Sequence, residues 1–344
     1  MDNEGVNKMK NNQFRKIPSL HKVYKSHFLI GAAVNPLTLQ TQQELIKKHF
    51  NSITAENEMK FEELQPEPGH FTFDVGDKMV AFAKENGMKV RGHTLIWHNQ
   101  TPDWMFKNED GSVTDRDTLL ERMKLHITTV MEHYKGQIYC WDVVNEAIAD
   151  EGSELLRHSK WTEIIGDDFI EKAFEYAHEA DPEALLFYND YNESHPHKRD
   201  KIYTLIKRLV DKGIPIHGVG LQAHWNLTDP SYEEIRAAIE KYASLGLEIH
   251  LTEMDVSVFN FEDRRTDLTE PTNEMKTLQV ERYTEFFKIL REYSHVISSV
   301  TFWGAADDYT WLDGFPVRGR KNWPFVFDEN HQPKESFWGI VDFE

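Results

Sequence analysis

Apolar and polar residues follow two different periods along this chain. Short runs that are apolar throughout or at every second position predict β-strands, and apolar residues at every third or fourth position predict helices. Glycine or an Asp-Pro pair ends most of the predicted helices. The predicted strands are 27–35, 50–57, 89–97, 138–146, 184–192, 216–224, 247–255 and 298–307, and the predicted helices are 38–49, 76–85, 115–135, 167–180, 197–212, 231–245, 273–293 and 334–341.

The predicted strands and helices alternate without exception. Such alternation indicates a parallel sheet covered by helices, and eight repeats match a (β/α)8 TIM barrel in the α/β class. A doubly wound sheet is the rival, but Asn35-Pro36 follows the first strand where that fold carries a glycine-rich loop. We find no linker and predict one catalytic domain over 21–344, preceded by a polar tail or short helix over 1–20.

Polar and aromatic residues gather at the C-terminal ends of the predicted strands. In a parallel barrel these ends meet at one face, which is where such enzymes keep their chemistry. Packing alone gives no reason to collect carboxylates, amides, imidazoles and indoles there. In strand order the residues are Glu56, Asn57 and nearby Lys60; His93, Trp97 and His98; Asn145 and Glu146; Tyr191 and Asn192; Gln222 and His224; Glu253 and Asp255; and Trp303 with nearby Trp311.

Glu146 and Glu253 stand out because they end the fourth and seventh strands, which lie roughly across the barrel mouth. Two such carboxyl groups and many aromatic side chains suggest glycoside hydrolysis, in which one acid protonates the leaving oxygen and a second carboxylate attacks or activates water. A separation of about 5–5.5 Å would predict retention of anomeric configuration, and about 6.5–9.5 Å inversion. Sugar rings offer apolar faces to indole and hydroxyl edges to polar side chains.

Composition narrows the class of partner. The 344 residues are 40% hydrophobic and 12% aromatic, with nine Trp, which indicates a globular protein. The formal net charge of −19 argues against a nucleic-acid partner. No apolar run approaches the about 20 residues that span a bilayer, so we expect no membrane partner. The N-terminus lacks the apolar core of a signal peptide, so we expect a cytoplasmic protein.

Several of these residues also have a simpler explanation. Asn145 and Asn192, taken alone, are typical turn formers, and tryptophans are more often core than sugar platforms. The single cysteine, Cys140, lies mid-strand and is expected to pack in the core. His93 and His98 invite a metal-site interpretation, but the first strand ends without a ligand, so we predict no metal and no cofactor.

Five segments together resemble one family, the family 10 glycoside hydrolases, which are endo-β-1,4-xylanases. The resemblance extends from about residue 24 to residue 342, and the segments occur in the family's order. They are Trp-Asp-Val-Val-Asn-Glu-Ala-Ile at 141–148, Leu-Thr-Glu-Met-Asp at 251–255, Thr-Ala-Glu-Asn-Glu-Met-Lys at 54–60, Arg-Gly-His-Thr-Leu-Ile-Trp-His at 91–98 and Gly-Leu-Gln-Ala-His-Trp at 220–225.

The resemblance implies a role for each residue. Glu146 would be the general acid/base and Glu253 the nucleophile of a retaining double displacement on xylan or xylo-oligosaccharides. Asn145 would hold the sugar 2-hydroxyl, and His224 would bond Glu253 with Asp255 on its other nitrogen. Gln222 would join this network, and Tyr191 and Asn192 would serve the aglycone side. The glycone subsites would be lined by Glu56, Asn57, Lys60, His93, Trp97, Trp303 and Trp311.

Alternatives remain open at this point. Another barrel glycosidase acting on β-glucan or β-mannan would use the same pair of carboxyl groups, and a sugar-binding barrel without catalysis would use the same aromatic residues. The absence of a visible leader resembles the intracellular xylanases that cut imported oligosaccharides. The oligomeric state is not predicted.

Overall fold

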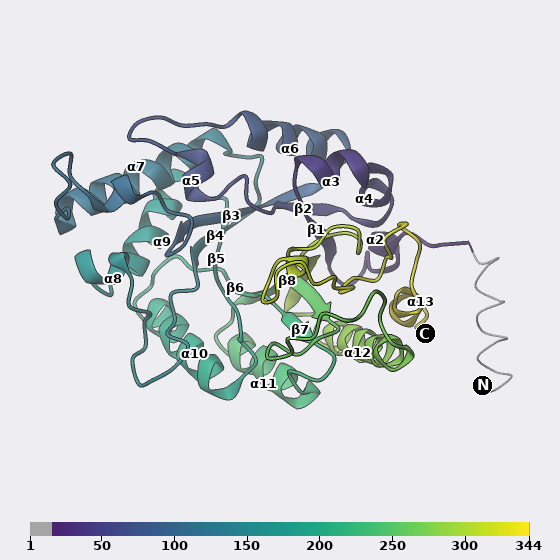
Figure 1. The fold of residues 1–344 in the computed structure, drawn as a ribbon. Helices are drawn as coiled ribbons and strands as arrows, with labels where there is room; N and C mark the ends of the chain where they lie inside the picture. Colours follow the sequence, from purple (N-terminus) through teal and green to yellow (C-terminus); the bar gives the residue numbers. More distant parts are fainter. Residues whose placement is uncertain (1–15, 344) are drawn as a thin grey trace, which may run out of the picture.

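The computed structural model describes residues 16–343 and places eight parallel strands in a closed barrel (Figure 1). Strand β1 pairs with both β2 and β9, and β6 pairs directly with β8, which closes the ring. The predicted (β/α)8 TIM barrel is therefore confirmed. The barrel strands are β1 (Leu29–Val34), β2 (Ser52–Ala55), β3 (Lys89–Trp97), β4 (Cys140–Asn145), β5 (Leu185–Asp190), β6 (Gly218–Leu221), β8 (Glu248–Ser257) and β9 (Ile297–Phe302).

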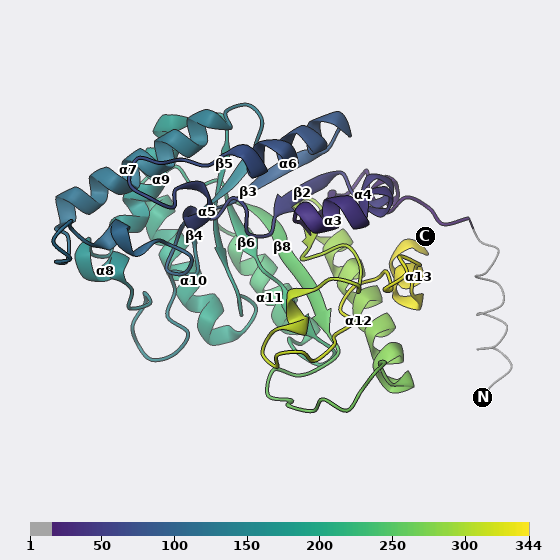
Figure 2. The same ribbon diagram turned by 45° about the horizontal axis from the view of Figure 1, so that its top comes forward.

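The barrel strands are buried on both faces, because one face points into the barrel and the other is covered by helices. All six residues of β4 are buried, as are eight of the ten in β8. The covering helices form a ring outside the strands (Figures 1 and 2). They are α2 (Leu20–Val23), α3 (Pro36–Thr41), α4 (Gln43–His49), α6 (Asp74–Glu85), α7 (Arg116–His133), α9 (Phe169–Ala180), α10 (Pro196–Asp211), α11 (Tyr232–Ala243), α12 (Asn273–Glu292) and α13 (Glu335–Val341).

The predicted sixth strand, 216–224, is wrong as a single element, because the structure has two strands there. Residues Gly218–Leu221 form β6, and a separate strand β7 (His224–Asn226) pairs with the C-terminal half of β8. Between them Ala223 has φ 58°, in the left-handed region that an L-residue with a Cβ rarely adopts. This break turns His224 away from the line of β6 and beside Asp255 on β8.

Helical segments too short to show a period were also missed or merged. The predicted helix 38–49 is two helices, α3 and α4, separated at Gln42. Four short elements in the loops were not predicted: α5 (Phe61–Leu64), η1 (Asp103–Phe106), α8 (Lys160–Ile164) and η2 (Trp311–Asp313). Of the predicted tail over 1–20, residues 1–15 lie outside the described part of the chain, and α2 begins at Leu20.

Charged side chains occupy part of the barrel interior. Arg91 on β3 forms a two-pronged ion pair with Asp142 on β4, with N···O distances of 2.7 and 3.2 Å, and its Nε donates to Nδ1 of His250 at 3.2 Å. Arg91 and Asp142 have no exposed surface. A buried ion pair is tolerated when its hydrogen bonds are satisfied. Asp142 of this pair also bonds His93, so the pair supports a residue of the barrel mouth from inside the barrel.

Cys140 begins β4 and has no exposed surface, as expected for a core residue. Burial raises the pKa of its thiol to about 12. Across residues 16–343, none of the helices combines the length and the apolar character that crossing a bilayer requires.

Candidate active site

Glu146 follows the last residue of β4 and has a left-handed backbone conformation, with φ 57°. Its backbone N–H donates to the carbonyl of Asn189 at 2.9 Å. Its carboxyl group accepts two side-chain hydrogen bonds, from Nε1 of Trp97 at 2.8 Å and from Nε2 of Gln222 at 3.0 Å. A strained backbone held by such contacts is common at functional sites, and here it directs the carboxyl group into the barrel mouth.

Glu253 lies on β8 and is 5% exposed. One carboxylate oxygen accepts from Nδ2 of Asn189 at 2.8 Å, and the other lies 3.1 Å from Nε2 of His224. Below it, Nε2 of His93 is 3.9 Å from the first oxygen. The carboxylate therefore has polar partners on three sides and is held in one orientation.

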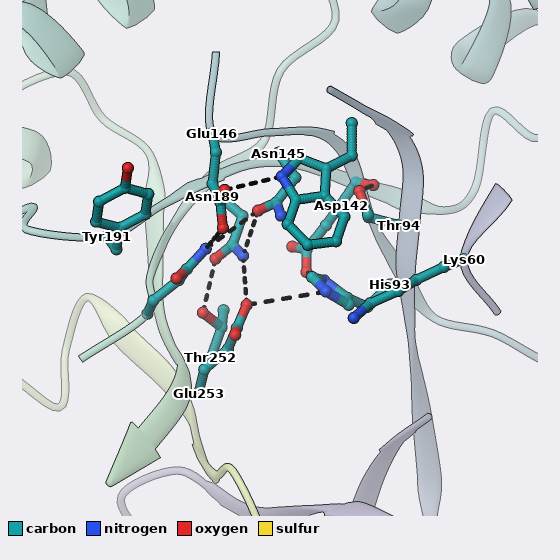
Figure 3. Close-up of polar contacts among 12 residues, drawn as sticks. Lys60, His93, Thr94, Asp142, Asn145, Glu146, Asn189, Tyr191, Thr252 and Glu253 are labelled. Atoms are coloured by element: carbon teal, nitrogen blue, oxygen red, sulfur yellow. Dashed lines mark hydrogen bonds and ion pairs between the residues drawn. The ribbon is translucent and has the colours of Figure 1, made fainter. Parts of the chain in front are cut away.

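An amide network joins the two glutamates. The Oδ1 atom of Asn145 accepts from Asn189 at 2.9 Å and from Gln222 at 3.3 Å. Because Asn189 also bonds Glu253 and Gln222 also bonds Glu146, only three amide side chains separate the two carboxyl groups. Figure 3 shows Glu146 and Glu253 approaching the same space from two sides, with the amides beside it.

Asn189 is held by its own surroundings. Its Oδ1 accepts from the hydroxyl of Thr252 at 2.6 Å, which fixes the orientation of the amide (Figure 3). Gly220 on β6 leaves the space for it, because a Cβ at that position would stand 2.3 Å from Oδ1 of Asn189 and 2.9 Å from a methyl group of Thr252. The glycine in the Gly-Leu-Gln segment thus has a steric role at the site.

A charged histidine supports Glu253. His224 contacts Asp255 through Nδ1 at 3.0 Å and Glu253 through Nε2 at 3.1 Å. Burial alone would lower the pKa of this imidazole, but the carboxylate of Asp255, followed by that of Glu253, raises the pKa to about 10. Trp311 donates to Asp255 at 2.9 Å and keeps this second carboxylate in place. His224 is therefore an imidazolium at neutral pH.

The two glutamates have pKa values shifted in opposite directions. Burial raises the pKa of Glu146, and the negative charges of Asp190 and Glu253 add to this effect. Burial would also raise the pKa of Glu253, but the hydrogen bond from His224 and the neighbouring His93 and Asn189 bring the pKa below its ordinary value. Environments that separate two carboxyl groups in this way define one proton donor and one carboxylate.

Polar residues predicted on the first part of the chain form one wall of the site. The ammonium of Lys60 donates to Oδ1 of Asn57 at 2.9 Å and lies 4.9 Å from the centre of the Trp97 ring. Glu56 accepts from Nδ2 of Asn35 at 2.8 Å and from the hydroxyl of Tyr309 at 3.0 Å. The wall therefore offers one ammonium, one carboxylate and one indole, and the N–H of that indole donates to Glu146.

The two tryptophans predicted at and beyond the last strand, Trp303 and Trp311, lie beside the histidines. Trp303 is 7% exposed, and its ring is perpendicular to that of His93 at 5.4 Å and to that of His224 at 6.5 Å. Trp311 lies 4.9 Å from His224. His93 is 2% exposed, and its Nδ1 bonds Asp142 at 2.9 Å, which holds the ring beside Glu253.

Tyr191 and Asn192 are less closely joined to the glutamates. The hydroxyl of Tyr191 contacts Asp150 and Arg157, both at 2.7 Å, and Figure 3 shows its ring apart from the amide network. Arg157 also donates through Nε to the backbone carbonyl of Glu146 at 3.1 Å, so this group braces the loop after β4. Asn192 is exposed and has φ 53°.

Residues that are not predicted from the sequence also take part in the site, among them Asn189, Thr252, Tyr309 and Arg157. Asn189 is the next-to-last residue of β5, and Thr252 lies within β8 beside Glu253. Side chains alternate between the two faces of a strand, so the pattern could have indicated Asn189 as an inward-facing position. Tyr309 and Arg157 belong to long loops, and no local pattern in the sequence indicates which residues a loop brings back to the site.

We expect the Asn189→Ala variant to lower kcat/KM by about 10- to 100-fold, because a hydrogen bond to a charged group contributes about 1.5–3 kcal/mol. Without the Asn189 donor the pKa of Glu253 should rise, so the acidic limb of the pH profile should move to higher pH. Thermal unfolding of the variant separates this effect from a loss of folding. An unchanged acidic limb would contradict the assigned contact.

The barrel and the paired glutamates define a glycoside hydrolase, and the family model described as glycosyl hydrolase family 10 matches residues 19–343. The chain belongs to this family, as its five motifs suggested.

Particular relatives are similar over nearly their full length. The chain is 63% identical to an endo-1,4-beta-xylanase of Geobacillus stearothermophilus over 326 residues, covering 95% of this chain and 98% of the relative. It is 58% identical to endo-1,4-beta-xylanase B of Paenibacillus barcinonensis, with the same coverage. The crystal structure of xylanase XynB from Paenibacillus barcinonensis, complexed with a conduramine derivative, superposes with a TM-score of 0.94 and covers 95% of this chain and 98% of that one.

Proposed function

We propose that this protein is a retaining endo-1,4-β-xylanase that hydrolyses internal β-1,4-xylosidic bonds of xylan or xylo-oligosaccharides. The observation that carries the proposal is the pair Glu146 and Glu253, joined by an amide network and shifted in pKa in opposite directions. Membership of glycosyl hydrolase family 10 supports the retaining outcome, and xylanase relatives at 63% and 58% identity favour xylan over β-glucan or β-mannan.

The first displacement uses both glutamates. A carboxylate oxygen of Glu253 forms a bond to the anomeric carbon, and the bond from that carbon to the leaving oxygen breaks. Glu146 gives its proton to the leaving oxygen, so the aglycone departs as a neutral alcohol. The product is a glycosyl ester on Glu253, and Glu146 is left as a carboxylate.

The second displacement reverses the roles. Glycosylation removes the negative charge of Glu253, so one of the charges that raise the pKa of Glu146 is lost. Glu146 then takes a proton from water, whose oxygen attacks the anomeric carbon while the ester bond breaks. Two inversions give net retention, and Glu253 returns to the charged contact with His224.

The remaining predicted residues are proposed as substrate contacts or supports. Asn145 would donate to the sugar 2-hydroxyl through Nδ2, because its Oδ1 already accepts two hydrogen bonds. Glu56, Asn57, Lys60 and His93 would bind hydroxyl groups on the glycone side, where the indole of Trp97 offers an apolar face. His224, Asp255 and Gln222 would act through the glutamates. Trp303 and Trp311 would cover the sugar at the cleavage site, and Tyr191 and Asn192 would serve the aglycone side.

Product analysis tests the proposal directly. Defined xylo-oligosaccharides should be cut at internal bonds, as mass spectrometry would show, and NMR should detect the β-anomer as the first sugar released. Reducing-sugar release should be fastest on xylan when xylan, mannan and cellulose oligomers are compared. First release of the α-anomer, or faster cleavage of mannan or cellulose oligomers, would contradict the proposal.

We expect kcat/KM to follow a bell-shaped pH profile. Glu253 must be ionised and its pKa is lowered, so activity should fall only as the pH drops below the ordinary value of 4.5. Glu146 must be protonated and its pKa is raised, so activity should fall as the pH rises through a value above 4.5. Initial rates on a xylo-oligosaccharide across pH measure both limbs. A basic limb below 4.5 would show that Glu146 is not the proton donor.

Location in the cytoplasm and a catalytic domain that starts near residue 21 remain proposals. Fractionation of the native cells, followed by xylanase assay of each fraction, tests the first. Activity and thermal unfolding of a chain shortened by its first 20 residues test the second.

A further inference from the structure

Two exposed phenylalanines lie beside each other at the edge of the active-site face. Phe261, in the loop after β8, is 57% exposed, and Phe315, in the loop after β9, is 47% exposed. Their ring centres are 5.8 Å apart and the rings are inclined at 53°. In the described part of the chain they are the only phenylalanines that are exposed. We call Phe261 and Phe315 the phenylalanine pair.

The phenylalanine pair continues a row of rings that starts at the catalytic centre. Phe315 stacks on Trp311 with a centre-to-centre distance of 5.3 Å and an angle of 16°. Trp311 in turn lies 4.9 Å from His224, which bonds Glu253. Phe315 is therefore two ring contacts away from His224, the residue that bonds Glu253, and the pair is not an isolated patch elsewhere on the barrel.

Buried polar side chains tie together the two loops that carry the pair. Arg320, 3% exposed, donates to the backbone carbonyl of Asp263 at 2.7 Å, and its guanidinium lies 4.0 Å from the ring of Phe259. Asn322, fully buried, accepts from the backbone N–H of Val258 at 3.2 Å and donates to the hydroxyl of Ser257 at 2.9 Å. The scaffold under the pair is thus fixed, although the rings themselves face solvent.

We propose that the phenylalanine pair is a distal sugar subsite, which holds a xylose unit of the same chain that is cut between Glu146 and Glu253. This inference rests on the proposed function. Two apolar ring faces inclined to one another offer a corner for the apolar face of a pyranose ring, and rings already fixed by their loops lose little entropy on binding. Only chains long enough to reach from the cleavage site to the pair gain this contact.

The Phe261→Ala variant tests the subsite. Phe261 contacts Phe315, and it is Phe315 that stacks on Trp311, so the substitution removes a ring of the pair without removing the neighbour of Trp311. The measurement is kcat/KM for xylo-oligosaccharides of increasing length, each divided by the wild-type value. The ratio should be near one for the shortest substrates and should fall by about 2- to 10-fold for the longest, the size expected for one aromatic contact. Phe261→Tyr, which keeps the ring, should restore the wild-type ratio.

A matched control comes from the far side of the barrel. Leu125 is 52% exposed and lies on α7, a helix that Figure 1 shows on the opposite side of the barrel from the segment between β8 and α12. Leu125→Ala removes a similar exposed apolar group and should leave the ratio flat at every length. A loss in Phe261→Ala that is the same at all lengths, or no loss at any length, would overturn the subsite.

Two further measurements separate the possible failures. Calorimetric titration with xylohexaose tests binding at the pair without turnover when Glu253→Ala is the parent protein. Weaker binding when Phe261→Ala is added to Glu253→Ala supports the subsite, and equal binding overturns it. Sedimentation tests whether the pair is instead a contact between two copies of the chain. Self-association that Phe261→Ala abolishes, with a kcat/KM ratio that does not depend on substrate length, would overturn the subsite. If the wild type cleaves no xylo-oligosaccharide, the proposed function fails, and the titration still decides whether the pair binds sugar.

Discussion

Replacing Glu253 with alanine should abolish hydrolysis of every xylosidic substrate, with a loss on the order of 10⁵-fold or more. The reason is that alanine removes the carboxylate that forms the ester with the sugar. Glu253 sits between Asn189, His224 and His93, and each of these supplies a hydrogen-bond donor or an imidazole rather than an attacking oxygen. The loss should affect substrates with good and with poor leaving groups, because attack by Glu253 and departure of either leaving group belong to the same displacement. Initial rates on xylan and on an aryl xyloside measure it.

Azide distinguishes a missing nucleophile from a damaged fold. In Glu253→Ala the azide ion can occupy the vacated side, form a bond to the anomeric carbon and displace an aryl leaving group, which gives an α-xylosyl azide after one inversion. A matched control is Glu248→Ala on the same strand, whose side chain is 46% exposed and accepts from Ser298 at 2.7 Å, and which should remain close to wild type. Residual xylan hydrolysis by Glu253→Ala near the wild-type rate would rule out the nucleophile assignment.

Replacing Glu146 with alanine should reduce activity unequally. On xylan, where the leaving alcohol needs a proton, we expect a loss of about 10²- to 10⁴-fold, the usual contribution of general acid–base catalysis. Aryl xylosides with acidic phenols leave without a proton, so the first displacement should keep a substantial rate. Pre-steady-state kinetics should then show a burst of phenol, because hydrolysis of the ester still lacks its base.

Azide again reports the stereochemistry for Glu146→Ala. It attacks the glycosyl ester on Glu253 and should give a β-xylosyl azide, the opposite anomer to that from Glu253→Ala. The Glu146→Gln variant, which keeps the size of the side chain but cannot deliver the same proton, should behave in the same way. Equal losses on good and poor leaving groups would show that Glu146 is not the acid.

The barrel and the pair of catalytic glutamates, Glu146 and Glu253, could be predicted from the sequence because each depends on local patterns. Strand and helix periods identify the alternation, and a barrel brings the ends of its strands together regardless of loop structure. Glu146 and Glu253 lie in or just after strands whose apolar residues the sequence identifies, so their meeting follows from topology alone. The hydrogen bonds that join His224 to Glu253 and Asp255 are also present.

Other features depend on contacts that no local pattern records. The separation of β6 from β7 results from the left-handed backbone at Ala223, a residue type that does not signal such a conformation. Asn189 is not predicted from the sequence, and its importance becomes visible once Gly220 is seen to leave room for it. Arg157 reaches Glu146 from a loop, eleven residues later in the chain, through a backbone carbonyl that carries no sequence signature.

The enclosed thiol at the start of β4 has a practical consequence. Cys140 has no surface and a pKa near 12, so almost none of it is thiolate at neutral pH and alkylating dyes cannot reach it. A cysteine introduced on the outside would therefore be the one group in residues 16–343 that a maleimide fluorophore labels in the folded protein. Dyes attached near the rim of the barrel would report the binding of a polysaccharide in real time, and the native Cys140 would not have to be replaced first.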